Sequence, residues 1–183
     1  MIYQFVHVPK VAGLSFLHIM DKHPGIFVYL GHTKASDVKK IAFVRNPYDR
    51  LTDAYFYLMS ANRIVQVDID SQEILKQYPD FKSCVLSIDK DDLMNRIEFH
   101  FRPMSYYLCN EDNKIIIDRI FKIEEIETID AFLASMGLPE KLSEIYANMT
   151  EYGNFMDHLD AEAIAEINRL YALDFELFGY TKL

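Results

Sequence analysis

The sequence is poor in the features that mark disulfide-stabilised, membrane-spanning and nucleic-acid-binding proteins. Its 183 residues include only two cysteines, six glycines and no tryptophan. Cys84 and Cys109 provide neither a disulfide framework nor metal-ligand spacing, which predicts a reducing compartment and no metal site. No apolar run is long enough to span a membrane. The net charge of -9 argues against nucleic acid and acidic membrane surfaces as partners.

The remaining composition is that of an ordinary globular chain. Half of the residues are hydrophobic and about a quarter are charged, so the chain has enough apolar surface to fold around a core. Its length predicts a single domain over residues 1–183. A core-like strand follows Met1 within a few residues, which leaves no room for a signal peptide, and we expect a cytoplasmic protein.

Short apolar segments alternate with helix-compatible segments in the first quarter of the chain. The β-favouring runs occupy residues 2–8, 26–30 and 41–45, and the helix-compatible stretches between them occupy residues 14–22 and 34–40. This order predicts an α/β fold with a parallel sheet and crossover helices.

The rest of the chain is mostly helical in pattern. Pro47 opens a helix at its first turn, where a missing N–H costs nothing. The further expected elements are an irregular segment at 60–86, a helix at about 89–98, a β-hairpin of 105–109 and 114–117 around the turn 110–113, a buried strand at 120–123, and a helix from about residue 160.

The segment FVHVPKVAGLSF, residues 5–16, is typical of an anion-binding loop. A turn that leads from a parallel strand into a helix aims main-chain N–H groups outward, and the helix adds its positive end. Lys10 supplies a full charge, Gly13 lets the main chain approach an anion closely, and Ser15 adds a hydroxyl donor. The residue after Lys10 is Val11, which cannot bind a metal as the hydroxyl residue of a Walker loop does. The alternative is a simple strand-to-helix turn with a surface lysine.

A second segment, IAFVRNPYDRLTDAYFYL, begins at Ile41 and delivers Arg45 to the carboxyl end of a predicted strand. Open parallel sheets bind ligands at that edge, and a guanidinium group is suited to bind a phosphate in a forked geometry. The alternative is a helix-capping arginine paired with Asp49. Arg50 is predicted to be a solvated partner of that kind.

Five segments resemble, in order, motifs of the sulfotransferases that use 3′-phosphoadenosine 5′-phosphosulfate. HVPKVAGLSF resembles their first loop, and FVRNPYDRLTDAYFYL resembles their second motif. Three further segments resemble the branch that includes carbohydrate 2-O-sulfotransferases: LGHTKASDV, HFRPMSYYL and LYALDFELFGY. Each is weak alone, but five in order are specific. The resemblance implies a P-loop-like three-layer α/β fold with a central parallel sheet flanked by helices.

The resemblance also implies a cofactor and the residues that bind it. The sulfuryl donor would be 3′-phosphoadenosine 5′-phosphosulfate, the nucleotide product adenosine 3′,5′-bisphosphate, and no metal would be required. Lys10 would neutralise the leaving 5′-phosphate, and Arg45 would bind the 3′-phosphate. The implied nucleotide-binding residues are Lys10, Val11, Ala12, Gly13, Leu14, Ser15, Arg45 and Asp53.

Three further residues receive roles from the resemblance. His32 matches the catalytic base of the branch, and an imidazole has a suitable pKa for taking the acceptor proton. His100 begins a matching motif and is predicted to lie in the core, in a supporting position or near the substrate. Arg102 would reach the nucleotide or an anionic substrate, or would pair with a carboxylate such as Glu98.

The chain departs from the family pattern at four positions. Val11 and Leu14 replace residues with hydroxyl groups, Met104 replaces a glutamine, and Asp53 stands where the family has a serine that donates to the 3′-phosphate. A carboxylate at position 53 would repel that phosphate, at a cost of about several kcal/mol.

Three hypotheses remain open from the sequence. The first is an active sulfotransferase that acts on a carbohydrate or a small hydroxylated metabolite. The second is a sulfotransferase-fold binding or regulatory protein that has lost affinity for the sulfuryl donor. The third is an enzyme that uses a nucleotide without a 3′-phosphate. The segments 60–86 and 100–113 are expected to set acceptor specificity, because loops vary most. The sequence indicates neither the acceptor nor the oligomeric state.

Overall fold

The computed structural model describes residues 1–28, 38–60, 65–145 and 152–183. The chain forms two compact units. The first unit contains residues 1–45 and 104–149, and the second contains residues 46–103 and 150–183. A single domain over residues 1–183 stays a prediction.

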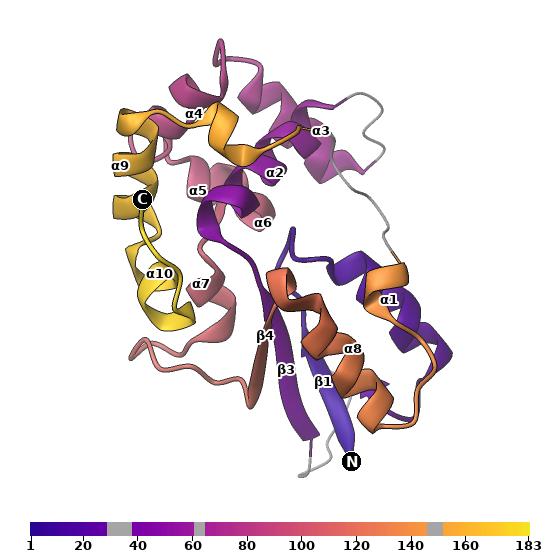
Figure 1. Cartoon of the computed structure of the whole chain (residues 1–183). Coiled ribbons are helices and arrows are strands. Elements are labelled where there is room, and N and C mark those ends of the chain that lie inside the picture. The colour runs from indigo at the N-terminus through magenta and orange to yellow at the C-terminus, as the bar shows by residue number, and fades with distance from the viewer. Residues whose placement is uncertain (29–37, 61–64, 146–151) are drawn as a thin grey trace. The chain divides into compact units, whose positions relative to one another are not determined.

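The first unit is built on a four-stranded parallel sheet (Figure 1). Ile2 pairs with Val38 at one end of the β1–β3 ladder, and Val44 pairs with Lys122 at the end of the β3–β4 ladder. The sheet confirms the predicted α/β class with a central parallel sheet flanked by helices. In the order β2-β1-β3-β4 the strands are β1 (Ile2–Val6), β2 (Phe27–Val28), β3 (Val38–Val44) and β4 (Arg119–Lys122).

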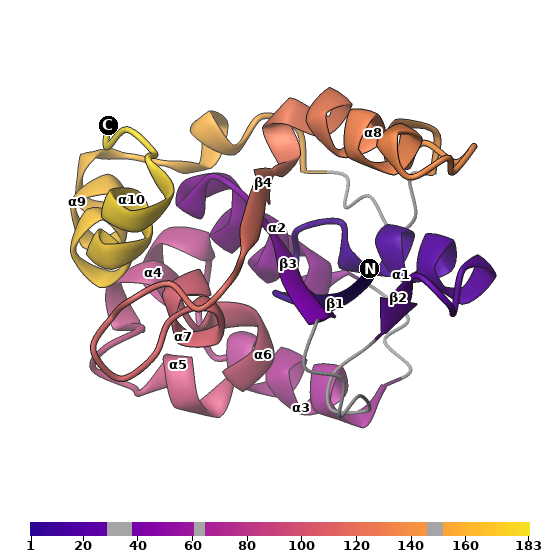
Figure 2. The ribbon, with the colours of Figure 1, turned by 90° about the horizontal axis from the view of Figure 1, so that it is seen from below.

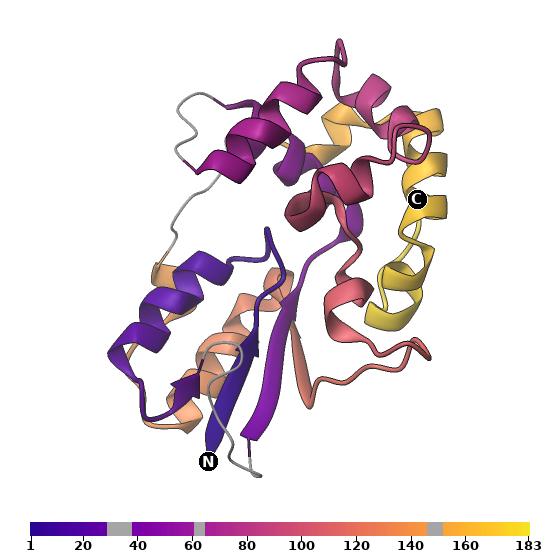
Figure 3. The same cartoon turned by 180° about the vertical axis from the view of Figure 1, so that it is seen from behind.

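This strand order places a topological switch point between β1 and β3. The chain leaves β1 for β2 on one side and returns to β3 on the other side of β1. The connections that follow β1 and β3 leave the sheet at the same edge (Figure 3). In open parallel sheets, ligands bind outside the carboxyl ends of the strands at such a point.

Aromatic side chains pack two helices onto one face of this sheet. The ring of Phe16 in α1 lies 4.7 Å from Phe5 and 4.8 Å from Phe43, measured between centroids. Phe132 in α8 lies 5.1 Å from Phe121. Figures 1 and 2 show α1 and α8 on one side of the sheet and α7 on the other. The helical elements of this unit are α1 (Gly13–Lys22), α7 (Met104–Leu108), η1 (Ile123–Glu125), α8 (Ile126–Ser135) and η2 (Leu142–Glu144).

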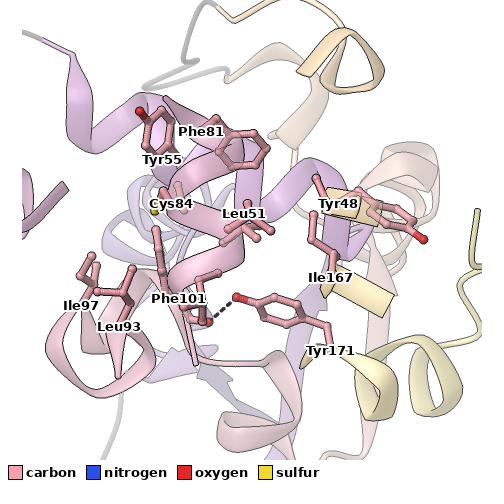
Figure 4. Close-up of a cluster of buried hydrophobic side chains, with 14 of the residues drawn as sticks. Tyr48, Leu51, Tyr55, Phe81, Cys84, Leu93, Ile97, Phe101, Ile167 and Tyr171 are labelled. Carbon is pink, nitrogen blue, oxygen red and sulfur yellow. Dashed lines mark hydrogen bonds between the residues drawn. The ribbon is translucent and has the colours of Figure 1, made fainter. Parts of the chain in front are cut away.

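The second unit is helical and has its own apolar core (Figure 4). Leu51 on α2 is completely buried in this core, and the Tyr171 hydroxyl donates a 2.6 Å hydrogen bond to the main-chain oxygen of Phe101. The elements of the unit are α2 (Pro47–Met59), α3 (Gln66–Leu75), α4 (Phe81–Ser87), α5 (Leu93–Arg96), α6 (Glu98–Phe101), η3 (Phe155–His158), α9 (Ala161–Leu170) and α10 (Ala172–Phe178).

The helix that the sequence predicts to open at Pro47 is confirmed as α2. Asn46 caps it, because its side-chain oxygen accepts a 3.0 Å hydrogen bond from the main-chain N–H of Tyr48. The helix predicted from about residue 160 is also confirmed, as α9 and α10, and Asp160 caps α9.

Two sequence predictions in the first half of the chain are wrong. The helix expected at 34–40 is contradicted from Val38 onward, where β3 begins, and residues 34–37 lie outside the described residues. The ammonium group of Lys39 pairs with Asp118 at 2.9 Å at the exposed start of the strand. The irregular segment expected at 60–86 contains α3 and α4. The buried residues of α3 are Asp68, Ser71 and Leu75, so a largely polar buried face hid the helical period.

Two further predictions are only partly right. The helix expected at 89–98 is reduced to the short α5, and α6 begins at Glu98. Of the hairpin expected around residues 110–113, the turn and a single antiparallel bridge between Cys109 and Ile115 are present. The segment expected as its first strand forms the helix α7 instead. The predicted strand at 120–123 is confirmed as β4, and the helix α8 that follows it was not predicted.

Candidate functional site

The loop between β1 and α1 has the main-chain conformation of an anion cradle. Lys10 and Ala12 both have positive φ, 69° and 61°, and both are non-glycine residues. Such left-handed residues, alternating with others, turn successive N–H groups toward one concavity. The first main-chain bond within α1 runs from Phe16 to Ala12 at 3.1 Å, so the N–H groups of residues 13–15 have no carbonyl partner in the helix. The positive end of α1 therefore faces the loop that carries Lys10.

Arg45 is anchored to this loop from the neighbouring strand. Its Nη1 donates a hydrogen bond to the main-chain oxygen of Lys10 at 3.2 Å. Its main-chain N–H donates to the sulfur of Met104 at 3.4 Å, and Met104 is completely buried. The structure thus brings together the two cations that the sequence assigned to the nucleotide, at the switch point of the sheet. The buried Met104 side chain thus helps to fix the position of the Arg45 main chain.

The other loop side chains differ in exposure. Val11 is completely buried, so its side chain contributes packing where the family pattern has a hydroxyl group. Leu14 is 50% exposed, and Ser15, expected to offer its hydroxyl at the surface of the helix start, is only 2% exposed. Of these three side chains, only that of Leu14 lies at the surface. The nucleotide-binding roles of Val11, Ala12, Leu14 and Ser15 stay predictions.

Gly13 has a packing reason to be glycine that the sequence did not reveal. A Cβ atom at this position would lie 2.0 Å from Nε2 and 2.2 Å from Cδ2 of His7. Real Cβ atoms do not approach other atoms this closely, so the imidazole ring occupies the space where a side chain would be. The close approach of an anion to the main chain at Gly13 stays a prediction.

Lys122 is a third cation at this edge that sequence reasoning missed. It is the last residue of β4 and pairs with Val44, the residue before Arg45. Along the edge, the loop after β1, the residue after β3 and the end of β4 therefore each carry a positive charge. The sequence interpretation treated 120–123 as a buried strand, and the lysine inside that apolar run was the available signal.

The described structure does not test the predicted roles of two further site residues. His32, the predicted base, lies outside the described residues. Asp53 belongs to the second unit, on α2, and is 6% exposed. The roles of both residues stay predictions that rest on the family motifs.

Arg50 is not the solvated partner that the sequence predicted. Its side chain is completely buried in the second unit. Its Nη2 donates hydrogen bonds to the main-chain oxygens of Arg102 at 2.8 Å and of His100 at 3.5 Å. The sequence could not reveal this role, because the carbonyl groups that accept from Arg50 belong to a segment about fifty residues further along the chain. Arg50 thus joins the second motif to the HFRP segment.

His100 lies in a small polar cluster of the second unit. Its Nε2 is 3.1 Å from Oδ1 of Asp68, and the Tyr57 hydroxyl donates a 2.9 Å bond to the other Asp68 oxygen. The guanidinium of Arg102 donates to the side-chain oxygen of Asn95 at 3.3 Å. His100 is mostly buried, which agrees with a supporting position. A contact of His100 or Arg102 with a substrate stays a prediction.

The described ranges contain no group of three or more His, Cys, Asp and Glu side chains placed to hold a metal ion. Within the same ranges no helix combines the length and apolarity needed to cross a membrane. Of the two cysteines, Cys84 is completely buried, and burial raises the pKa of its thiol to about 12, which makes it unreactive.

The chain was compared with known proteins and protein families. No curated protein and no solved structure matches it significantly. A model described as the sulfotransferase family matches residues 4–181. This range includes both motifs that build the anion cradle and the last helix, as the sequence resemblance implied. The chain therefore belongs to the sulfotransferase family.

Proposed function

We propose that this protein transfers a sulfuryl group from 3′-phosphoadenosine 5′-phosphosulfate to a hydroxyl or amine group of a carbohydrate or small metabolite. The observation that supports this most is the hydrogen bond from Arg45 to the main chain of Lys10 at the switch point. It joins the two motif cations at one anion-binding edge. Family membership supports transfer of a sulfuryl group, and the sulfuryl donor and acceptor are our proposal.

The residues present fit a doubly phosphorylated nucleotide. The N–H groups at the start of α1 and the ammonium group of Lys10 suit a phosphosulfate, because both supply positive charge without a metal. The guanidinium group of Arg45 suits a terminal phosphate such as the 3′-phosphate. The nucleotide, when bound, supplies an activated sulfonate attached to a phosphate leaving group.

The protein's own residues would then stabilise charge and accept a proton. Lys10 and the positive end of α1 would stabilise the negative charge that the phosphate leaving group gains when its bond to sulfur breaks. The acceptor hydroxyl loses its proton as the new bond to sulfur forms. His32 is the proposed base for that proton, because the LGHTKASDV segment resembles the branch whose catalytic base it matches and because imidazole has a suitable ordinary pKa.

The second candidate function is a sulfotransferase-fold protein that binds or regulates without transferring. Asp53 favours it, because the family places a serine there to donate to the 3′-phosphate. The valine at position 11, where the family pattern has a hydroxyl residue, and the burial of Ser15, which is 2% exposed, also reduce the number of hydroxyl groups presented to a ligand. Under this alternative the cradle would keep its shape but bind the bisphosphate weakly.

Calorimetric titration with adenosine 3′,5′-bisphosphate, with adenosine 5′-phosphate as control, tests the proposal. We expect the bisphosphate to bind at least tenfold more tightly, because Arg45 acts on the extra phosphate. Transfer is then measured with the labelled sulfuryl donor over a panel of carbohydrates and phenols. Tight binding without transfer to any acceptor in the panel would favour the second function. Equal affinity for the two nucleotides would contradict a site for the 3′-phosphate.

A further inference from the structure

Arg45 is held at two points, one on its side chain and one on its main chain. Its guanidinium group donates a hydrogen bond to the main-chain oxygen of Lys10 at 3.2 Å. Its main-chain N–H donates to the sulfur of Met104 at 3.4 Å, although the two residues are 59 positions apart in the sequence. Arg45 directly follows Val44, the last residue of β3, so the second bond fixes the main chain where it leaves the sheet.

Met104 reaches this N–H from the face of the sheet opposite α1 and α8. It is the first residue of α7 and is completely buried. Figure 2 shows α7 on that side of the sheet. Ser105 and Leu108 of the same helix are buried as well. The helix is therefore packed along its length, and the sulfur of its first residue has little freedom to move away from Arg45.

The sulfur atom is the part of the Met104 side chain that packing does not explain. A leucine has a similar volume and would fill a buried position without a polar atom. Methionine is commonly an adaptable filler of irregular gaps in a core, which is the alternative role here. At this position, however, the only atom of the side chain that can accept a hydrogen bond accepts one from Arg45, a proposed phosphate ligand.

A forked hydrogen bond between a guanidinium group and a phosphate depends strongly on position. Two parallel N–H groups must meet two oxygens of the phosphate. Groups that bind a ligand must be held within about 0.5 Å of their productive position by the residues behind them. The bond to Lys10 restrains only the far end of the Arg45 side chain. The bond to Met104 restrains the main chain from which that side chain extends.

We propose that Met104 is a positioning residue for recognition of the 3′-phosphate of the nucleotide. Its sulfur fixes the main chain of Arg45, so that the guanidinium group meets this phosphate while it remains bonded to Lys10. Met104 acts through Arg45 and does not contact the nucleotide. This inference rests on the proposed function, since Arg45 is the proposed ligand of the 3′-phosphate. It makes the preference for adenosine 3′,5′-bisphosphate over adenosine 5′-phosphate depend on a buried residue of α7.

Two substitutions of Met104 separate positioning from packing. Met104→Leu conserves the volume and removes the acceptor, so its melting temperature should stay close to that of the original chain. Its affinity for adenosine 3′,5′-bisphosphate should nevertheless fall about five- to tenfold, as expected when one hydrogen bond is lost, while its affinity for adenosine 5′-phosphate stays within about twofold. Met104→Gln keeps an acceptor oxygen but buries an amide group. It should melt at a lower temperature and still keep the preference for the bisphosphate within about twofold.

Hydrogen exchange at the Arg45 amide tests the contact without any ligand. Measured by nuclear magnetic resonance, this exchange should be about tenfold faster in Met104→Leu than in the original chain, because the amide loses its acceptor. In Met104→Gln it should stay close to that of the original chain. Met20→Leu is the matched control, because Met20 is also a buried methionine of the first unit. It should change neither the exchange nor the preference for the bisphosphate.

The outcomes distinguish this inference from the proposed function. Unchanged exchange at Arg45 in Met104→Leu would overturn the inference. A preference that follows stability, retained in Met104→Leu and lost in Met104→Gln, would show that Met104 only packs. Equal binding of the two nucleotides by the original chain would instead contradict the proposed function.

Discussion

Arg45 donates a hydrogen bond from Nη1 to the main-chain oxygen of Lys10 at 3.2 Å. The bond connects a residue at the end of β3 with the loop that follows β1, so it crosses the switch point of the sheet. A guanidinium group has five N–H donors, and this bond uses one of them. The left-handed Lys10 is therefore held in place by the same side chain that is proposed to bind the 3′-phosphate.

Replacement of Lys10 tests the proposed stabilisation of the leaving phosphate. Lys10→Ala should lower the affinity for adenosine 3′,5′-bisphosphate about ten- to hundredfold, because a hydrogen bond to a charged group contributes about 1.5–3 kcal/mol. Turnover in a sulfation assay should fall with it, and the melting temperature should stay nearly unchanged. Lys22→Ala, at the other end of α1, is the control. An unchanged sulfation rate would remove Lys10 from the mechanism, and abolition of activity by a chelator would contradict the argument from Val11.

Lys122 should contribute charge to the same edge. Lys122→Met should weaken bisphosphate binding about threefold to tenfold, because the lost charge lies at the same edge of the sheet as Lys10 and Arg45 and attracts an anion there. Lys40→Met is the matched control, because it removes the same charge toward the opposite end of the sheet. Lys40 shares a sheet face with Val44, the residue that pairs with Lys122. The salt dependence of binding should also decrease in Lys122→Met. Equal effects of the two substitutions would show that only net charge matters.

Arg50 should matter for stability. Arg50→Met leaves the buried carbonyl groups of His100 and Arg102 without this donor and should lower the free energy of unfolding by about 3 kcal/mol. Urea unfolding followed by circular dichroism measures the change. Arg169→Met is the control, because Arg169 forms exposed ion pairs with Glu166 and Asp89, which contribute little. A stability loss no larger than that of the control would mean that the carbonyl groups find other partners.

Substitution of Asp53 distinguishes the active enzyme from the binding protein, because the family motif has a serine at this position. Asp53→Ser restores the family's residue and should tighten adenosine 3′,5′-bisphosphate binding about tenfold by removing a like charge. Binding of adenosine 5′-phosphate should not change, because it lacks the phosphate concerned. The two affinities are measured by calorimetry. If neither changes, the alignment of the second motif at position 53 is wrong.

An ion pair in the first unit should make its stability sensitive to acid. The hydrogen bond from His23 at 2.7 Å lowers the pKa of the Glu140 carboxyl below its ordinary value of 4.5. A lowered folded-state pKa stabilises the protein above the unfolded-state value, and this stability is lost as the pH falls through the folded-state pKa. Glu140→Gln should therefore lose less stability than the original chain between neutral pH and pH below 4.5. Parallel unfolding curves for both proteins over this range would contradict the pair's contribution.

Much of the fold, and the place of Lys10 and Arg45 at one edge of the sheet, could be predicted from the sequence, because the responsible signals are local. The apolar, β-favouring run at 2–8 predicts a buried strand. The loop that contains Lys10 must follow this strand. Pro47 fixes the start of α2 through its own ring geometry. Arg45 falls at a strand end because it directly follows the apolar strand and Pro47 opens a helix two residues later. The motifs that identify the sulfotransferase family are likewise short continuous segments.

Only the tertiary structure decided the features that depend on partners distant in sequence. Arg50 is buried because carbonyl groups at residues 100 and 102 need its donors, and no local pattern reveals that need. Lys39 belongs to a strand because β1 pairs with it and Asp118 neutralises it. Gly13 is glycine because of the ring of His7, six residues earlier and on the neighbouring element. Local sequence sets the preferred backbone conformation of each segment. The space left for a side chain, and the hydrogen-bond partners it must satisfy, depend on residues that come together only after the chain has folded.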